Sequence, residues 1–187
     1  MNPRRRLLIA SVAIVPFALA GCAGLDTMAA LLGNQFSLSQ MQIQQSLNGN
    51  FPKRYDKLGG LISLSLMNPR LSIPADSHRM RVDFDLGIGT FGGGSKPNGH
   101  FALSSGVRFD ARTLGIHLDQ PAIESVDVPA LGGAMNSTVR GALNAWLADY
   151  SRDEPIYEFD NTLLGRIGSR RVGSTEIANG QVVVKLQ

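Results

Sequence analysis

The chain has 187 residues, of which 43% are hydrophobic, and a formal net charge of +3 at pH 7. Residues 1–21 contain three basic residues, Arg4, Arg5 and Arg6, and no acidic residue. Without residues 1–21, the chain has 15 basic and 15 acidic side chains. Those basic side chains are too few and too scattered to follow a phosphate backbone. The composition therefore excludes a nucleic-acid partner.

A signal peptide is predicted at the start of the chain. The three arginines are followed by Leu7–Leu19, a mostly apolar run of thirteen residues. This run is too short for a transmembrane helix, which takes about 20 residues, and is typical of the hydrophobic region of a signal peptide. Ala20 and Gly21 then precede Cys22, the only cysteine, in an order that resembles the bacterial lipobox. The alternative is an ordinary secretory signal with an unrelated cysteine.

The resemblance to a lipobox implies that Cys22 is acylated, with palmitate or a similar chain, and that residues 1–21 are cleaved off. Two or three acyl chains attach a protein stably to a membrane, whereas one chain binds marginally. Ala23 stands where aspartate would favour the inner membrane, so the resemblance implies the outer membrane, with the protein facing the periplasm. We expect 22–34 to be a lipidated tether and 35–187 to be one domain that folds without disulfides.

The first predicted helix begins near Phe36. Ser37 and Gln40 match a capping box, with Ser39 as the alternative N-cap, and Phe36 is expected to pack on Met41. The apolar side of this helix is assigned to Met41, Ile43 and Leu47, and the segment 49–52 ends it.

From residue 61 onward, apolar and polar side chains alternate with a period of two. This pattern predicts antiparallel strands with one dry face and one wet face. Ser63 and Ser65 are assigned to the wet face. The dry face is expected to comprise Ile62, Leu64 and Leu66; Met80, Val82, Phe84, Leu86 and Ile88; Phe101, Leu103, Ser105, Val107 and Phe109; and Leu114, Ile116 and Leu118, in a last strand that continues to Val128.

A long amphipathic helix is predicted from about Ala130 to Asp149, with one continuous apolar stripe. A short strand over 156–159, a helical turn over 162–167 and a closing strand over 182–186 are expected to follow. The predicted fold class is α+β, a curved antiparallel sheet whose apolar face is covered by the long helix.

The motifs that suggest chemistry have simpler explanations. Gly87–Gly92 matches G-x-G-x-x-G, but its glycines lie in a strand that leads to another strand, whereas a dinucleotide site needs a helix there. Asp83 and Asp85 alternate with arginines, which favours charge pairing across strands over a metal site. The three histidines are scattered and form no recognisable arrangement with a nucleophile. We therefore predict a non-enzymatic protein with no cofactor and no metal.

Two interpretations of the apolar residues stay open. One is plain core packing, and the other is a partly filled groove between helix and sheet that accepts an acyl chain or a similar ligand. The groove would be lined by Val82, Phe84, Leu86, Phe101, Leu103, Val107, Met135, Val139, Leu143 and Trp146.

The segment Asn34–Gln40 with Ile43 and Leu47, together with Glu154–Tyr157 and the strand around Val182, resembles the YceB-like lipoproteins, a bacterial family of unknown function. The resemblance spans essentially the whole mature chain. It implies a tubular lipid-binding-like fold, a curved sheet wrapped around a long helix, and a membrane-anchored protein that binds a lipid or another apolar molecule. The alternative is a structural or assembly lipoprotein that binds another envelope protein and has no ligand of its own.

Overall fold

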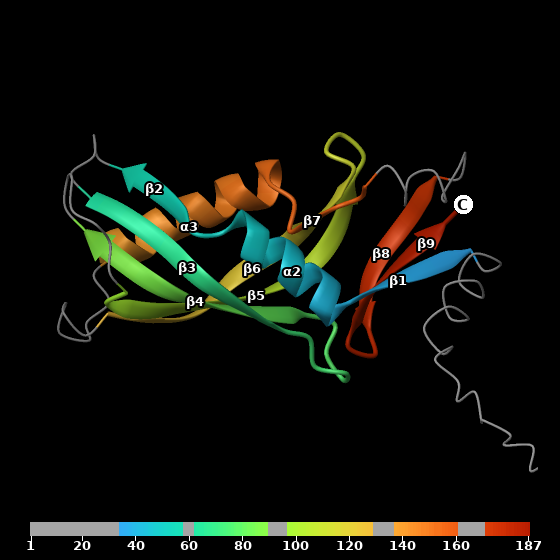
Figure 1. Ribbon diagram of the computed structural model, residues 1–187, viewed down its shortest axis with the longest axis horizontal. Helices are drawn as coiled ribbons and strands as arrows, with labels where there is room; N and C mark the ends of the chain where they lie inside the picture. Colours follow the sequence, from blue (N-terminus) through green and yellow to red (C-terminus); the bar gives the residue numbers. More distant parts are fainter. Residues whose placement is uncertain (1–33, 58–61, 90–96, 129–136, 161–170) are drawn as a thin grey trace, which may run out of the picture.

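The computed structural model describes residues 34–57, 62–89, 97–128, 137–160 and 171–187 (Figure 1). Of these residues, 57% lie in strands and 22% in helices. The elements are β1 (Gln35–Ser39), α2 (Gln40–Asn50), β2 (Lys53–Lys57), β3 (Ile62–Ser72), β4 (Met80–Gly89), β5 (Gly99–Asp110), β6 (Gly115–Asp127), α3 (Ser137–Asp153), β7 (Tyr157–Glu158), β8 (Val172–Ala178) and β9 (Gln181–Leu186).

The predicted α+β, tubular lipid-binding-like fold is wrong. The described chain is mostly β, its two helices have 11 and 17 residues, and its strands form two antiparallel sheets, so it contains no long helix wrapped by a sheet. The sequence pattern missed β1 and β8, which pair with β9 in a second sheet. The pairing of β1 with β9 joins the two ends of the described chain, and no local pattern near β1 reveals such a distant partner.

The larger sheet has six strands in the order β2-β3-β4-β5-β6-β7. Its predicted dry face is confirmed at the centre, where Val82 pairs with Leu103 and Phe84 with Phe101, and all four side chains are buried. Helix α3 packs against this face (Figure 1), since the Trp146 ring lies 6.2 Å from the Phe84 and Phe101 rings. The main core of the protein therefore lies between α3 and the central strands.

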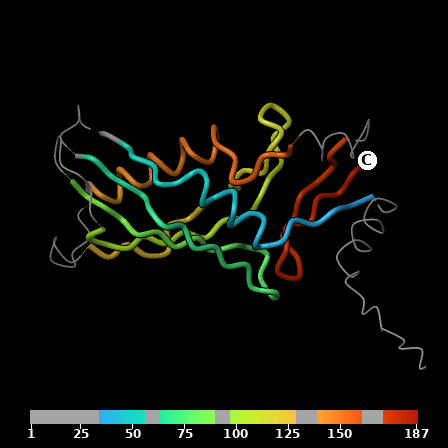
Figure 2. Tube along the Cα trace, viewed as in Figure 1, coloured from blue at the N-terminus to red at the C-terminus, as the bar shows by residue number. Residues whose placement is uncertain are grey.

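The smaller sheet has the order β1-β9-β8 and brings the two ends of the described chain together (Figure 2). Its buried residues include Leu38 of β1 and Val182 of β9, which are partners in the register. The predicted closing strand is confirmed, and the turn before it has positive φ at Asn179 and Gly180, as a tight hairpin requires.

The predicted start of the first helix is wrong, because the segment around Phe36 is strand β1. Ser39, the alternative N-cap, begins α2 and forms the capping box with Gln42. Ile43 and Leu47 are buried as predicted, but Met41 is 70% exposed.

Strand β3 departs from the predicted alternation. Ser63 and Ser65, assigned to the wet face, are buried. The pairing of β3 with β4 is irregular between Met67 and Arg70, and the strand continues past this point to Ser72. This irregularity shapes the pocket described below.

Candidate functional site

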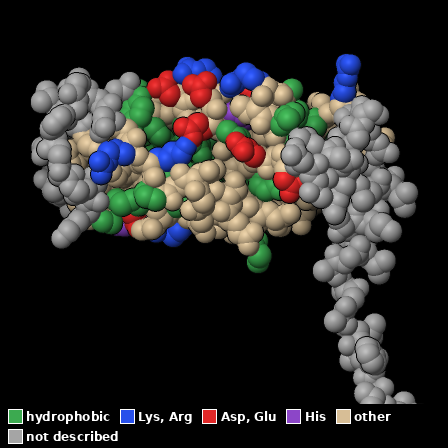
Figure 3. All heavy atoms as spheres, turned by 45° about the horizontal axis from the view of Figure 1, so that its top comes forward, with side chains coloured by type: hydrophobic (Ala, Val, Ile, Leu, Met, Phe, Trp, Pro, Cys, Tyr) green, Lys and Arg blue, Asp and Glu red, His purple; other side chains and the backbone are tan. Residues whose placement is uncertain are grey.

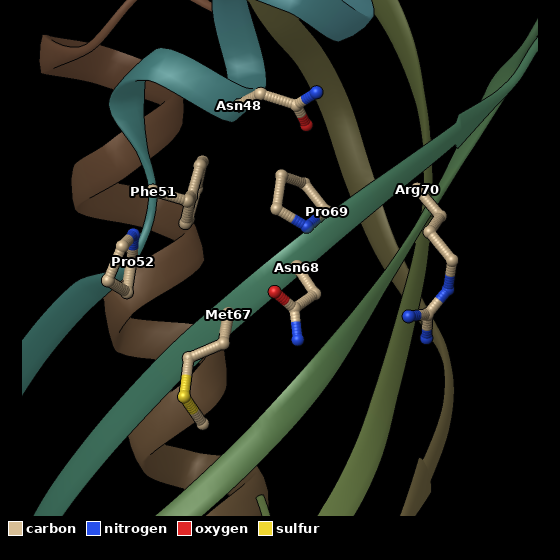
Figure 4. A pocket seen from close by; sticks show the side chains of 7 residues that line it. All are labelled: Asn48, Phe51, Pro52, Met67, Asn68, Pro69 and Arg70. Carbon is tan, nitrogen blue, oxygen red and sulfur yellow. The ribbon is translucent and has the colours of Figure 1, made fainter.

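A pocket of about 610 Å³ lies between the end of α2 and the irregular part of β3. Figure 4 shows that its side chains come from α2, the segment before β2, and β3, and that Arg70 stands apart from Phe51 and Pro52. The lining residues are Asn48, Phe51, Pro52, Met67, Asn68, Pro69 and Arg70. Its volume falls within the range of about 300–1,000 Å³ that is usual for small-molecule sites.

Two glutamine side chains of α2 hold one wall of this pocket in place. Gln44 Nε2 donates to the Pro69 carbonyl at 2.7 Å, and its Oε1 accepts from the Leu71 N–H at 2.7 Å. Gln40 makes the same pair of bonds one turn earlier, to the Leu71 carbonyl at 3.0 Å and the Ile73 N–H at 3.1 Å. Residues four apart share one face of a helix, so both amides reach the same strand.

These amide bonds explain how an open sheet edge becomes a pocket wall. Strand β2 pairs with β3 only as far as Lys53 opposite Leu66, which leaves the rest of that edge without a neighbouring strand. Unpaired backbone groups at a sheet edge need other partners. The amides of Gln40 and Gln44 supply these partners. The pocket is the space between the start of β2 and the contact of the two amides with β3.

The inner side of the pocket is apolar. Phe51 is 8% exposed and lies between the pocket and the aromatic core, with its ring centroid 5.0 Å from that of Phe84 and 5.8 Å from that of Tyr150. Pro69 is buried, and Met67 is half-buried. An aliphatic or aromatic group entering the pocket would exchange water for these surfaces.

The charged group on the rim is already paired. Arg70 donates to Asp85 at 2.9 Å, and Asn68 donates to the other oxygen of that carboxylate at 2.7 Å. The hydrogen bond from Arg70 is the main reason why the pKa of Asp85 lies below its usual value. The predicted pairing of the strand aspartates with arginines is present, although Asp83 pairs with Arg81 of its own strand.

The residues predicted to line a groove come together at the contact of α3 with the sheet. All are buried, with Val82, Phe84, Leu86, Phe101, Leu103 and Val107 on the strands and Val139, Leu143 and Trp146 on α3, whereas Met135 lies outside the described residues. Where the Trp146, Phe84 and Phe101 rings meet, side chains occupy the space between helix and sheet. These side chains would have to move before a ligand could enter between α3 and the sheet. The structure therefore gives no support to the groove, which stays a prediction.

Tyr150 carries an unusual polar group within this core. The residue is 4% exposed, and among the described residues its hydroxyl has no hydrogen-bond partner. Burial raises the pKa of Tyr150, so the hydroxyl is protonated and available as a donor. The ring stacks on Trp146 at 5.1 Å, and Lys53 Nζ lies 5.4 Å from its centroid.

The histidines have separate surroundings. His117 is fully buried, with Nε2 2.6 Å from Thr113 Oγ1 and Nδ1 3.2 Å from the Ser151 carbonyl. Burial is the main cause that lowers the pKa of His117. His117 thus joins β6 to the end of α3 as a neutral ring. Within the described ranges, no group of three or more His, Cys, Asp or Glu side chains is placed to hold a metal ion.

Sequence reasoning missed the α2–β3 pocket. Both of its sides are interrupted by a proline, Pro52 after α2 and Pro69 in β3, which is a local signal of irregular backbone. Nothing in the sequence shows that these two interruptions meet. Figure 3 shows acidic and basic side chains interspersed on one face of the molecule.

No protein-family model matches the sequence, and the search of curated proteins finds no match. The resemblance to YceB-like lipoproteins therefore stays a prediction from the quoted residues. The signal peptide, Cys22 and the tether lie outside the described residues. In the described part of the chain, no helix is both long and apolar enough to cross a bilayer.

Proposed function

We propose that this chain is a lipid-anchored protein of the outer membrane, facing the periplasm, that binds a lipid or another apolar molecule without catalysing a reaction. The observation that carries the ligand part of the proposal is the α2–β3 pocket. It offers an apolar inner side at Phe51, Met67 and Pro69 and a volume suited to part of an acyl chain.

The polarity of the pocket favours a ligand whose main part is uncharged. Its one charged lining residue, Arg70, is compensated by Asp85. Burying an uncompensated charge under a ligand would cost several kcal/mol, and an aliphatic chain in this pocket avoids that cost.

The location rests on the sequence. A basic segment, a short apolar run and Cys22 follow one another as in lipoproteins, and Ala23 favours the outer membrane. Acylation is tested with labelled palmitate and with membrane fractionation of Cys22→Ser. Labelling of the parent and loss of the variant from membranes are expected. An unlabelled parent together with a variant that still fractionates with membranes would contradict the anchor.

Ligand binding is tested by native mass spectrometry of the gently purified full chain and two tryptophan variants. Met67→Trp fills the pocket, whereas Met41→Trp adds the same side chain to a 70% exposed position of α2. Lipid bound to the parent and to Met41→Trp, but lost from Met67→Trp, is expected. Lipid retained by Met67→Trp would show that the binding site lies elsewhere. A parent that carries no lipid and takes none up would count against a ligand.

A structural or assembly role is the second candidate, and strand β1 favours it. This strand lies at the edge of the described three-stranded sheet and follows the predicted tether. Its residues, Gln35–Ser39, carry no charge, although edge strands are commonly protected by charged side chains. A partner protein could add a strand there. This role would be favoured if Ser37 crosslinks in cells to one envelope protein reproducibly and if Met67→Trp leaves that crosslink unchanged.

A further inference from the structure

Tyr150 has a buried hydroxyl to which the described residues offer no hydrogen bond. The side chain is 4% exposed, and no hydrogen-bond partner for its Oη exists among the described residues. A buried donor without an acceptor destabilises a folded protein, and native structures rarely keep one without a reason. A ligand oxygen that accepts this hydrogen bond would supply such a reason.

The hydroxyl belongs to a ring that lies directly behind the pocket. Phe51 lines the pocket, and its ring centroid is 5.8 Å from that of Tyr150. Tyr150 also stacks on Trp146, with 5.1 Å between centroids. Phe51 is therefore a lining side chain that lies next to the Tyr150 ring.

A positive charge lies at the same end of the pocket. Lys53 follows the lining residue Pro52, and its ammonium is 5.4 Å from the Tyr150 ring centroid and paired with Glu154. Partial burial lowers the pKa of Lys53, whereas an anion close to the ammonium would favour its charged form. A carboxylate accepts a hydrogen bond from a hydroxyl and is favoured by a positive charge nearby.

We propose that the ligand is a long-chain fatty acid whose carboxylate accepts a hydrogen bond from Tyr150 Oη while its chain lies in the pocket between α2 and β3. The proposal rests on the proposed function and names its ligand class. It assigns Phe51 as the side chain that turns aside to admit the carboxyl group. The same arrangement predicts that the unliganded protein gains stability when the hydroxyl is removed.

The test uses the full chain with Cys22→Ser, so that no acyl group of its own competes. Stearic acid is titrated by calorimetry, and 9,10-dibromostearic acid is titrated while tryptophan fluorescence is recorded. The chain contains one tryptophan, so quenching reports on Trp146 alone. Tyr150→Phe removes only the hydroxyl, and Tyr157→Phe removes the hydroxyl of a half-buried tyrosine on β7 as a matched control.

The proposal predicts that the brominated acid quenches Trp146 and that Tyr150→Phe weakens stearic acid binding about tenfold, the effect of losing one hydrogen bond. Unliganded Tyr150→Phe should also melt at a higher temperature, and Tyr157→Phe should bind like the parent. Calorimetric binding without quenching, or equal affinity of Tyr150→Phe, would overturn this inference and leave the proposed function standing. A parent that binds no fatty acid by calorimetry and carries no lipid would overturn both.

Discussion

The two helices contact the large sheet in different ways. Helix α3 contacts it through buried aromatic and aliphatic side chains, among which Trp146 meets Phe84 and Phe101. Helix α2 also buries Ile43 and Leu47, but it contacts the edge of β3 through the amides of Gln40 and Gln44, beside an open pocket. Apolar packing tolerates little empty space, whereas directional bonds hold two elements at a fixed distance and leave room between them. The contrast explains why the pocket lies beside α2.

The largest expected effect lies at the α3 contact. Phe101 is 1% exposed and contacts both Phe84 and Trp146. Phe101→Ala should lower the free energy of unfolding by about 3–5 kcal/mol, because it removes buried apolar surface and leaves a cavity. Urea denaturation measures the change. A loss below about 1 kcal/mol would show that the side chains here are loosely packed and would favour the predicted groove.

A smaller loss of stability is expected at the α2 contact. Gln44→Leu removes both hydrogen bonds to β3 and leaves the Leu71 N–H and the Pro69 carbonyl without these partners. The cost should be about 1–3 kcal/mol by urea denaturation, together with weaker ligand binding. Gln45→Leu makes the same change at an exposed position of α2. Equal effects of the two variants would contradict the role assigned to Gln44.

Acid should weaken the junction between β6 and the end of α3. The pKa of His117 is lowered in the folded protein, chiefly by burial, from a usual value of 6.5. Folding therefore favours the neutral ring, so this contribution is complete above pH 6.5 and is lost as the pH falls below 6.5 toward the folded-state pKa. Unfolding free energies of the parent and His117→Gln at pH 7.5 and pH 5.5 should show a steeper decline for the parent. Parallel declines would refute the assignment.

The smallest effect is expected at the exposed face of α2. Met41 is 70% exposed, so Met41→Gln should change the free energy of unfolding by no more than about 0.5 kcal/mol. Ligand affinity should also stay unchanged. A larger loss by urea denaturation would mean that Met41 packs against part of the chain outside the described residues.

The sequence predicts the central strands and the closing strand well and the segment around Phe36 poorly. Val82 and Phe84 alternate with charged residues, and this local pattern identifies their buried face without knowledge of the fold. Near the N-terminus, Ser37 with Gln40 and Ser39 with Gln42 both match a capping box. The pairing of Phe36 with Val184 decides between them, and no pattern near Phe36 reveals that distant partner.

The candidate site illustrates the same limit. The α2–β3 pocket combines residues 48–52 with residues 67–70, which the fold brings together. Taken alone, each of these two segments shows only a proline. The predicted lining of the α3 groove was identified because burial follows from periodicity, but periodicity does not distinguish a filled core from a cavity.

The central claim is that an apolar ligand binds between α2 and β3. The most direct measurement is the shift of methionine methyl resonances of the full chain with Cys22→Ser as lauric acid is added, because Met67 lines the pocket, Met41 is exposed on α2 and Met80 is fully buried. The Met67 signal should move and saturate with the acid while the Met41 signal stays in place. A titration that shifts Met80 and leaves Met67 unchanged, or that shifts neither, would contradict the claim.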